Sequence, residues 1–172
     1  MLKYYNGDMF TSDADIICHQ VNCKGVFEKG LDGQIRRLFP EVEKTYKLLT
    51  KQWQEQADGR TWELLGRVSA QPVQKDGRWF LIANLYGQDD YGKDKVYTDY
   101  RALEQAVQEI RDFADARDKQ EKIAFPYMIG CSNAGGDWGV VQGILERVFK
   151  GYQGEVQIWN NKRSADETSA VR

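Results

Sequence analysis

Two glycine-bearing segments are the parts of this sequence best suited to chemistry. The first, residues 22–33, contains Gly25 and Gly30, and the second, residues 128–136, contains Gly130 and Gly135. Glycines let backbone N–H groups approach an anion closely, and a helix that begins after such a loop offers its positive N-terminal end. We therefore expect a diphosphate to lie between the two loops; two ordinary strand-to-helix turns are the alternative.

Neither loop matches a standard nucleotide motif. Gly25 and Gly30 have P-loop spacing, but Leu31-Asp32 stands where that motif needs lysine followed by serine or threonine, which excludes a P-loop NTPase. The sequence also lacks G-x-G-x-x-G. Glu28 and Asp32 repel a nearby phosphate, so they favour a second possibility, an interaction protein with a degenerate site.

His19, the single histidine, follows an apolar segment and is the candidate general acid or base, with Asp137 as a weaker second. A packed, hydrogen-bonded histidine is the alternative. Cys131 lies in the second loop, where a helix N-terminus can lower a thiol pKa, but no second histidine is present to act as its base. We expect Cys131 to pack. The histidine and the three cysteines lack the spacing of metal ligands, so no metal and no cofactor is expected.

Strands and helices alternate along the chain. Apolar runs and turn signals predict strands at 2–5, 14–21, 63–73, 79–86, 123–127 and 156–159, with a hairpin at Asp76-Gly77. Helical spacing predicts helices at 34–39, from residue 40, from 98 to about 119 with Thr98 as cap, and at 138–150 with Asp137 as cap. This order predicts a three-layer α/β/α fold with a mixed central sheet, in which ligands bind beyond the carboxyl ends of the strands.

Composition limits the remaining possibilities. The chain has 172 residues, 29% of them charged, a net charge of −2, a pI near 5.5 and a mean hydropathy of −0.66. We expect one domain over residues 1–160 and a flexible tail over 161–172. No apolar run approaches the length of a membrane span, and the acidic pI argues against binding a nucleic-acid backbone. Three cysteines without a signal peptide predict a cytoplasmic protein, and we expect a monomer.

Several of these segments, in this order, resemble a macro domain, the ADP-ribose-binding module. They are Gly7-Asp8-Met9, Ile16–Asn22, and Ile129–Ser132 followed by Gly135-Gly136. The resemblance covers about residues 2–160. It implies that Asp8, with Met9 beside it, binds the adenine amino group and that Asn22 binds the distal ribose. It places the diphosphate on the two loops, at Gly25, Gly30, Gly130, Cys131, Ser132, Asn133 and Gly135.

Within that family, His19–Gly25 is similar to the H-x-x-N-C-x-G of the ADP-ribose 1″-phosphate phosphatase branch, which includes phage and bacterial proteins. This similarity implies a catalytic part for His19. A sister branch of glycohydrolases uses a lysine and an aspartate where this chain has Gln88 (or Gly87) and Ala134. The predicted function is binding of ADP-ribose or a close derivative, with hydrolysis of a 1″-phosphate or an ADP-ribosyl bond. A non-catalytic ADP-ribose reader is the alternative.

Overall fold

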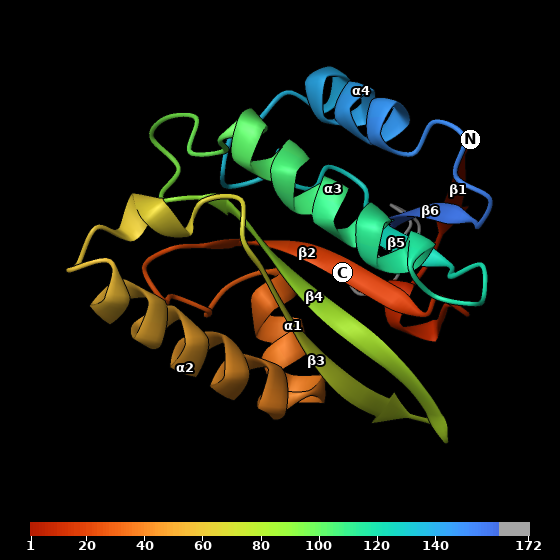
Figure 1. The fold of residues 1–172 in the computed structure, drawn as a ribbon, viewed down its shortest axis with the longest axis horizontal. Helices are drawn as coiled ribbons and strands as arrows, with labels where there is room; N and C mark the ends of the chain where they lie inside the picture. The colour runs from red at the N-terminus through yellow and green to blue at the C-terminus, as the bar shows by residue number, and fades with distance from the viewer. Residues whose placement is uncertain (162–172) are drawn as a thin grey trace, which may run out of the picture.

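The computed structural model describes residues 1–161, so all but the first residue of the predicted tail lies outside the described residues. The six strands are β1 (Leu2–Asn6), β2 (Ile16–Asn22), β3 (Val68–Lys75), β4 (Arg78–Gln88), β5 (Ile123–Pro126) and β6 (Val156–Asn160). The α-helices are α1 (Leu31–Leu38), α2 (Pro40–Gln56), α3 (Tyr100–Asp115) and α4 (Trp138–Val148). Two 3-10 turns, η1 (Met9–Thr11) and η2 (Thr61–Leu64), complete the chain (Figure 1).

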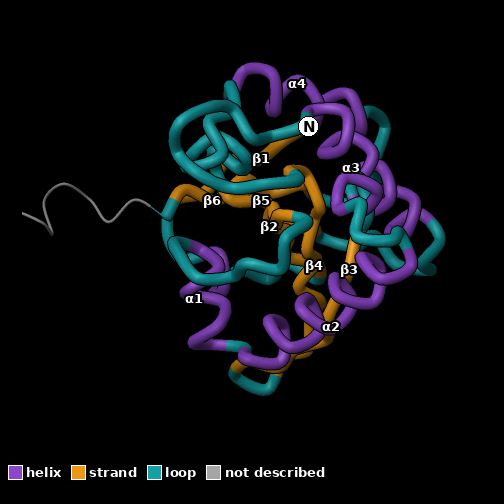
Figure 2. Tube along the Cα trace, turned by 90° about the vertical axis from the view of Figure 1, so that its left-hand side faces the viewer, coloured by secondary structure: helices purple, strands orange, loops and turns teal. Residues whose placement is uncertain are grey.

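The strands form one mixed sheet in the order β1-β6-β5-β2-β4-β3. Only the β3–β4 hairpin is antiparallel, and the other neighbours are parallel. Helices α1 and α2 cover one face and α3 and α4 the other, as Figures 1 and 2 show. The predicted three-layer α/β/α fold is confirmed, and the carboxyl ends of β1, β6, β5, β2 and β4 meet at one edge of the sheet.

Successive side chains of β2 point to opposite faces of the sheet, so this strand contributes to the core on both faces. Ile16 and Cys18 belong to the core under α3 and α4, whereas Ile17 and Val21 belong to the core under α1 and α2. All four side chains are at least 99% buried. A central parallel strand is covered on both faces, and its nearly continuous apolar run reflects this. His19 therefore faces the layer of α1 and α2, and Gln20 faces the opposite layer.

Some predicted boundaries are wrong for identifiable reasons. Asp99, not Thr98, caps α3, because its carboxylate accepts from the Ala102 N–H at 2.9 Å. The Thr98 hydroxyl instead donates to the Gly130 carbonyl at 2.6 Å. The predicted strand at 63–73 begins only at residue 68, because Thr61–Leu64 form a 3-10 turn that buries Leu64.

Other local predictions are confirmed. Asp137 caps α4 by accepting from the Val140 N–H at 3.2 Å. Asp76 and Gly77 have φ values of 51° and 77°, as a type I′ hairpin turn requires. Across residues 1–161, none of the helices combines the length and apolar character that crossing a membrane requires.

Candidate functional site

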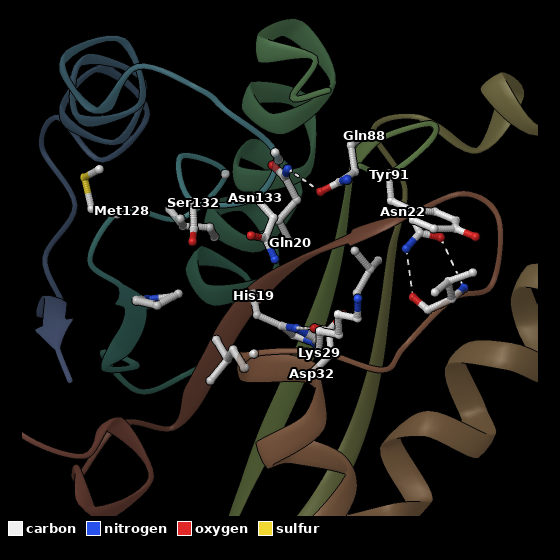
Figure 3. Close-up of a pocket in the computed structure, with 18 of the residues that line it drawn as sticks. His19, Gln20, Asn22, Lys29, Asp32, Gln88, Tyr91, Met128, Ser132 and Asn133 are labelled. Atoms are coloured by element: carbon white, nitrogen blue, oxygen red, sulfur yellow. Dashed lines mark hydrogen bonds and ion pairs between the residues drawn. The ribbon is translucent and has the colours of Figure 1, made fainter. Parts of the chain in front are cut away.

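A cleft of about 580 Å³ lies at the edge where the parallel strands end. Three loops line it: the first glycine loop, the second glycine loop, and the middle loop that follows β4 (Figure 3). Gln88, the last residue of β4, lines the cleft together with Tyr91, Gly92 and Lys93 of the middle loop. The two glycine loops therefore meet at one site, as the sequence predicted from their positions after β2 and β5.

The side chain of Asn22 shapes the first loop. Its amide nitrogen donates to the Val26 carbonyl at 2.8 Å, and its oxygen accepts from the Lys24 N–H at 3.0 Å. The Tyr46 hydroxyl, from α2, donates to the Asn22 carbonyl at 2.7 Å. Asn22 lines the cleft, but only one of its amide hydrogens is free for a ligand because the Val26 carbonyl takes the other.

His19 lines the floor of the cleft, is almost fully buried, and contacts Asp32 at the start of α1. Its Nδ1 is 3.0 Å from an Asp32 carboxylate oxygen, and its Nε2 is 2.5 Å from the Asn84 amide oxygen. The His19 side chain is only 2% exposed, whereas that of Asp32 is 20% exposed. Figure 3 shows Asp32 and Lys29 beside His19. The histidine therefore reaches the cleft chiefly through the carboxylate.

Glycines let the backbone of the second loop pack closely at positions where a side chain would not fit. Gly130 has a φ of +73°, and a Cβ there would lie 2.9 Å from the Gln20 side-chain oxygen. At Gly136 a Cβ would lie 2.6 Å from the Gly130 carbonyl oxygen, which accepts from the Gly136 N–H at 2.9 Å. Ser132 and Asn133 are exposed and line the cleft.

Gln20 ties this second loop to the middle loop. Its amide nitrogen donates to the Gln88 oxygen and to the Thr98 hydroxyl, each at 2.9 Å, and Thr98 donates to Gly130. The Gln88 nitrogen donates to the Asp90 carbonyl at 2.9 Å. These hydrogen bonds hold the Gln88 amide in one orientation where it lines the cleft. Ala134 also lines the cleft and is buried.

Other predicted site residues do not line the cleft. Asp8 caps η1 by accepting from the Phe10 N–H at 2.8 Å, and the buried Met9 follows it. Asp137 is an exposed helix cap. Gly25, Cys131 and Gly135 belong to the loops but not to the lining, and a Cβ on Gly135 would lie 3.1 Å from the Lys95 carbonyl oxygen.

The Cys131 thiol is poorly suited to nucleophilic attack. It is 9% exposed, and burial raises its pKa to about 11. Burial likewise raises the pKa of Cys23 to about 12 and that of Cys18 still further. Residues 1–161 contain no group of three or more His, Cys, Asp or Glu side chains that could hold a metal ion.

Sequence reasoning missed one site residue, Asn84, a fully buried amide in β4. Lys93 and Lys95 were candidates from the sequence as amines of the middle loop, and of these two Lys93, an exposed amine, lines the cleft. The signal for Asn84 was one polar residue inside the apolar run Phe80–Tyr86. An amide in such a place needs a buried polar partner, and His19 on the neighbouring strand provides it.

Comparisons with known proteins agree on the architecture. No family model matches the sequence. An uncharacterised 17.5 kDa protein from the tk-vs intergenic region of bacteriophage T4 is 26% identical over 148 residues, which are 85% of this chain and 88% of that protein. The macrodomain of Mycobacterium tuberculosis DarG superposes with a TM-score of 0.72 at 21% identity, covering 94% of this chain and 99% of that one.

A third similar structure is Thermosipho africanus DarTG in complex with ADP-ribose. It superposes with a TM-score of 0.75 at 20% identity, over 97% of this chain and 44% of that one. These structures overlap almost all of this chain, but their sequences are only about a fifth identical to it. The superpositions therefore establish the fold alone. The mixed sheet, its four helices and these superpositions show that the chain has the macrodomain fold.

Proposed function

We propose that this protein binds ADP-ribose, or a close derivative, in the cleft at the carboxyl edge of the sheet. The observation that carries the proposal is the meeting of both glycine loops along one cleft in a macrodomain fold. Backbone N–H groups around Gly30 and in the lining residues Gly130, Ser132, Asn133 and Ala134 would hold the diphosphate. Asn22 and Asp32 both line the cleft, where they would accept the distal ribose.

The adenine would lie toward Asp8 and Met9. The turn η1 that contains Met9 packs against β5, whose last residue, Pro126, lines the cleft. One Asp8 oxygen caps η1, which leaves the second oxygen to accept from the adenine amino group.

We further propose that the bound derivative is hydrolysed at its distal ribose. Asp32 is the carboxylate that both lines the cleft and contacts a buried imidazole. It would take a proton from the attacking water. With a 1″-phosphate, the water oxygen bonds to phosphorus, the bond from phosphorus to the ribose oxygen breaks, and that oxygen takes the proton. The products are ADP-ribose and inorganic phosphate. His19 acts through Asp32, and Asp137 takes no part.

The chemistry of the sister glycohydrolases is not supported by the side chains at this site. The resemblance implies that Gln88 (or Gly87) stands where those enzymes have a lysine nucleophile, and the Gln88 amide is held by Gln20 and Asp90. Lys93 also lines the cleft, from further along the same loop. A Lys93→Ala variant therefore tests whether that amine substitutes for the missing lysine.

The experiment compares phosphate release from ADP-ribose 1″-phosphate by the wild type, Asp32→Asn and Lys93→Ala. We expect Asp32→Asn to lose about 10²- to 10⁴-fold in rate, as removal of a general base usually does. Lys93→Ala is expected to retain most of its activity. Binding of ADP-ribose without turnover in the wild type would identify a reader, and full activity in Asp32→Asn would contradict the assigned role.

A further inference from the structure

A hydrogen-bonded series of four polar side chains runs from the sheet interior to the cleft floor. Ser69 and Asn84 are directly paired across β3 and β4, and both are buried. The Asn84 nitrogen donates to the Ser69 hydroxyl at 3.0 Å, and the Asn84 oxygen faces His19. His19 in turn faces Asp32, which is the one partly exposed side chain of these four.

The orientation of the Asn84 amide indicates which hydrogen His19 carries. Because the Asn84 amide nitrogen points toward Ser69, its oxygen points toward Nε2 of His19. An amide oxygen only accepts hydrogen bonds, so Nε2 must carry a hydrogen. Nδ1 faces the Asp32 carboxylate at 3.0 Å, with an N–H when the ring carries two hydrogens and with a lone pair when it carries only the one on Nε2.

We propose that Asn84 and Ser69 are positioning residues that hold a hydrogen on Nε2 of His19, so that the Nδ1 proton alone decides whether Asp32 is held at the cleft floor. With that proton present, Nδ1–H donates to the carboxylate and fixes it. Without it, a nitrogen lone pair faces carboxylate lone pairs, and the contact is lost. Asp32 is therefore held when the ring carries both hydrogens and released when it carries only the hydrogen on Nε2.

The other ionisable groups around the pair leave this arrangement intact. Tyr46 of α2 stays a neutral phenol, because burial and the Asp32 charge raise its pKa. Glu28 and Lys29 belong to the exposed rim of the first loop. On the opposite side, the ring of His19 packs edge-on against Phe27, with 5.5 Å between ring centres.

The chain offers a clean measurement because His19 is its only histidine. In ¹⁵N-histidine-labelled protein, long-range ¹H–¹⁵N spectra report the two ring nitrogens separately. We expect Nε2 to carry a hydrogen in both the neutral and the doubly protonated ring. A neutral ring with its proton on Nδ1 and a bare Nε2 would overturn the proposal.

Variants make the test specific. Asn84→Leu removes the oxygen, and we expect the neutral ring to move its proton to Nδ1, where Asp32 is the remaining acceptor. Asn84→Asp keeps an oxygen in place and should keep the hydrogen on Nε2. Ser69→Ala frees the amide to turn and should give both tautomers. Retention of the Nε2–H tautomer alone in Ser69→Ala and Asn84→Leu would contradict the proposal; should Asn84→Leu not fold, Ser69→Ala and the wild type decide.

These spectra are recorded without ligand, so their outcome is independent of whether the protein binds ADP-ribose. The consequence for binding rests on the proposed function. Wild-type affinity for ADP-ribose should be higher when Nδ1 carries a hydrogen than when it does not, and affinity measured against pH reports this dependence. In Asn84→Leu that dependence should be lost, because Nδ1–H then persists. An unchanged pH profile in a folded Asn84→Leu protein with the Nδ1–H tautomer would show that Asp32 does not contribute to binding.

Discussion

Two carboxylates of the first loop, Glu28 and Asp32, have different surroundings and should respond differently to substitution. The sequence suggested that both repel a phosphate. Glu28 is exposed at the cleft rim, but Asp32 contacts the buried His19. We expect Glu28→Gln to tighten ADP-ribose binding about two- to fivefold, the range of a screened surface charge. Asp32→Ala should weaken binding, because it leaves the imidazole without its partner.

Calorimetric titration of both single variants measures this contrast. Glu41→Gln provides the matched control, since Glu41 is a partly exposed carboxylate at the start of α2 and is not part of the cleft lining. Tighter binding by Asp32→Ala would show that its charge opposes the ligand after all.

The three cysteines should be unreactive in the folded protein. Burial raises the pKa of Cys131 to about 11, so below that pH the thiol keeps its proton. We expect alkylation by iodoacetamide at about pH 8 to be about a hundredfold slower than for a free thiol, because only the thiolate reacts. Mass spectrometry before and after unfolding in urea checks this. Rapid labelling of Cys131 in the folded state would contradict the buried, protonated state.

Among the elements, the second glycine loop and α4 offer a matched pair of glycines. A Cβ at Gly136 would lie 2.6 Å from a backbone oxygen, whereas at Gly143 it would meet no atom within 4 Å. We expect Gly136→Ala to lower the free energy of unfolding by about 1–3 kcal/mol through overpacking. Gly143→Ala should raise it by about 0.5–1 kcal/mol through helix propensity. Urea titration measures both; equal effects would contradict the close packing at Gly130.

Elements with a strong local signal were predictable from sequence. The stripe of α3, the Asp137 cap and the Asp76-Gly77 turn all depend on residues near each other in the chain. The cap of α3 was misplaced by one residue because Thr98 and Asp99 are both good caps, and the distant Gly130 carbonyl takes the Thr98 hydroxyl. Local propensity cannot register a partner 32 residues away.

In the molecule as a whole, sequence could predict the edge of the sheet that carries the site but not its internal contacts. Alternating strands and helices place both glycine loops at the carboxyl edge. The contact between His19 and Asn84 joins residues 65 positions apart and depends on the β2–β4 register. The same limit explains why Asp32 was interpreted as an isolated charge, since its partner lies on another element.

Isothermal titration with ADP-ribose tests the central claim most directly. We compare the wild type with Ser132→Trp, which fills the cleft from the second loop, and with Trp79→Ala, which alters an exposed side chain at the opposite edge of the sheet. The account predicts micromolar binding, on the order of −8 kcal/mol, in the wild type and in Trp79→Ala. It predicts at least about a tenfold loss, or about 1.4 kcal/mol, in Ser132→Trp. No heat at millimolar ADP-ribose, or unaltered affinity in a folded Ser132→Trp protein, would contradict it.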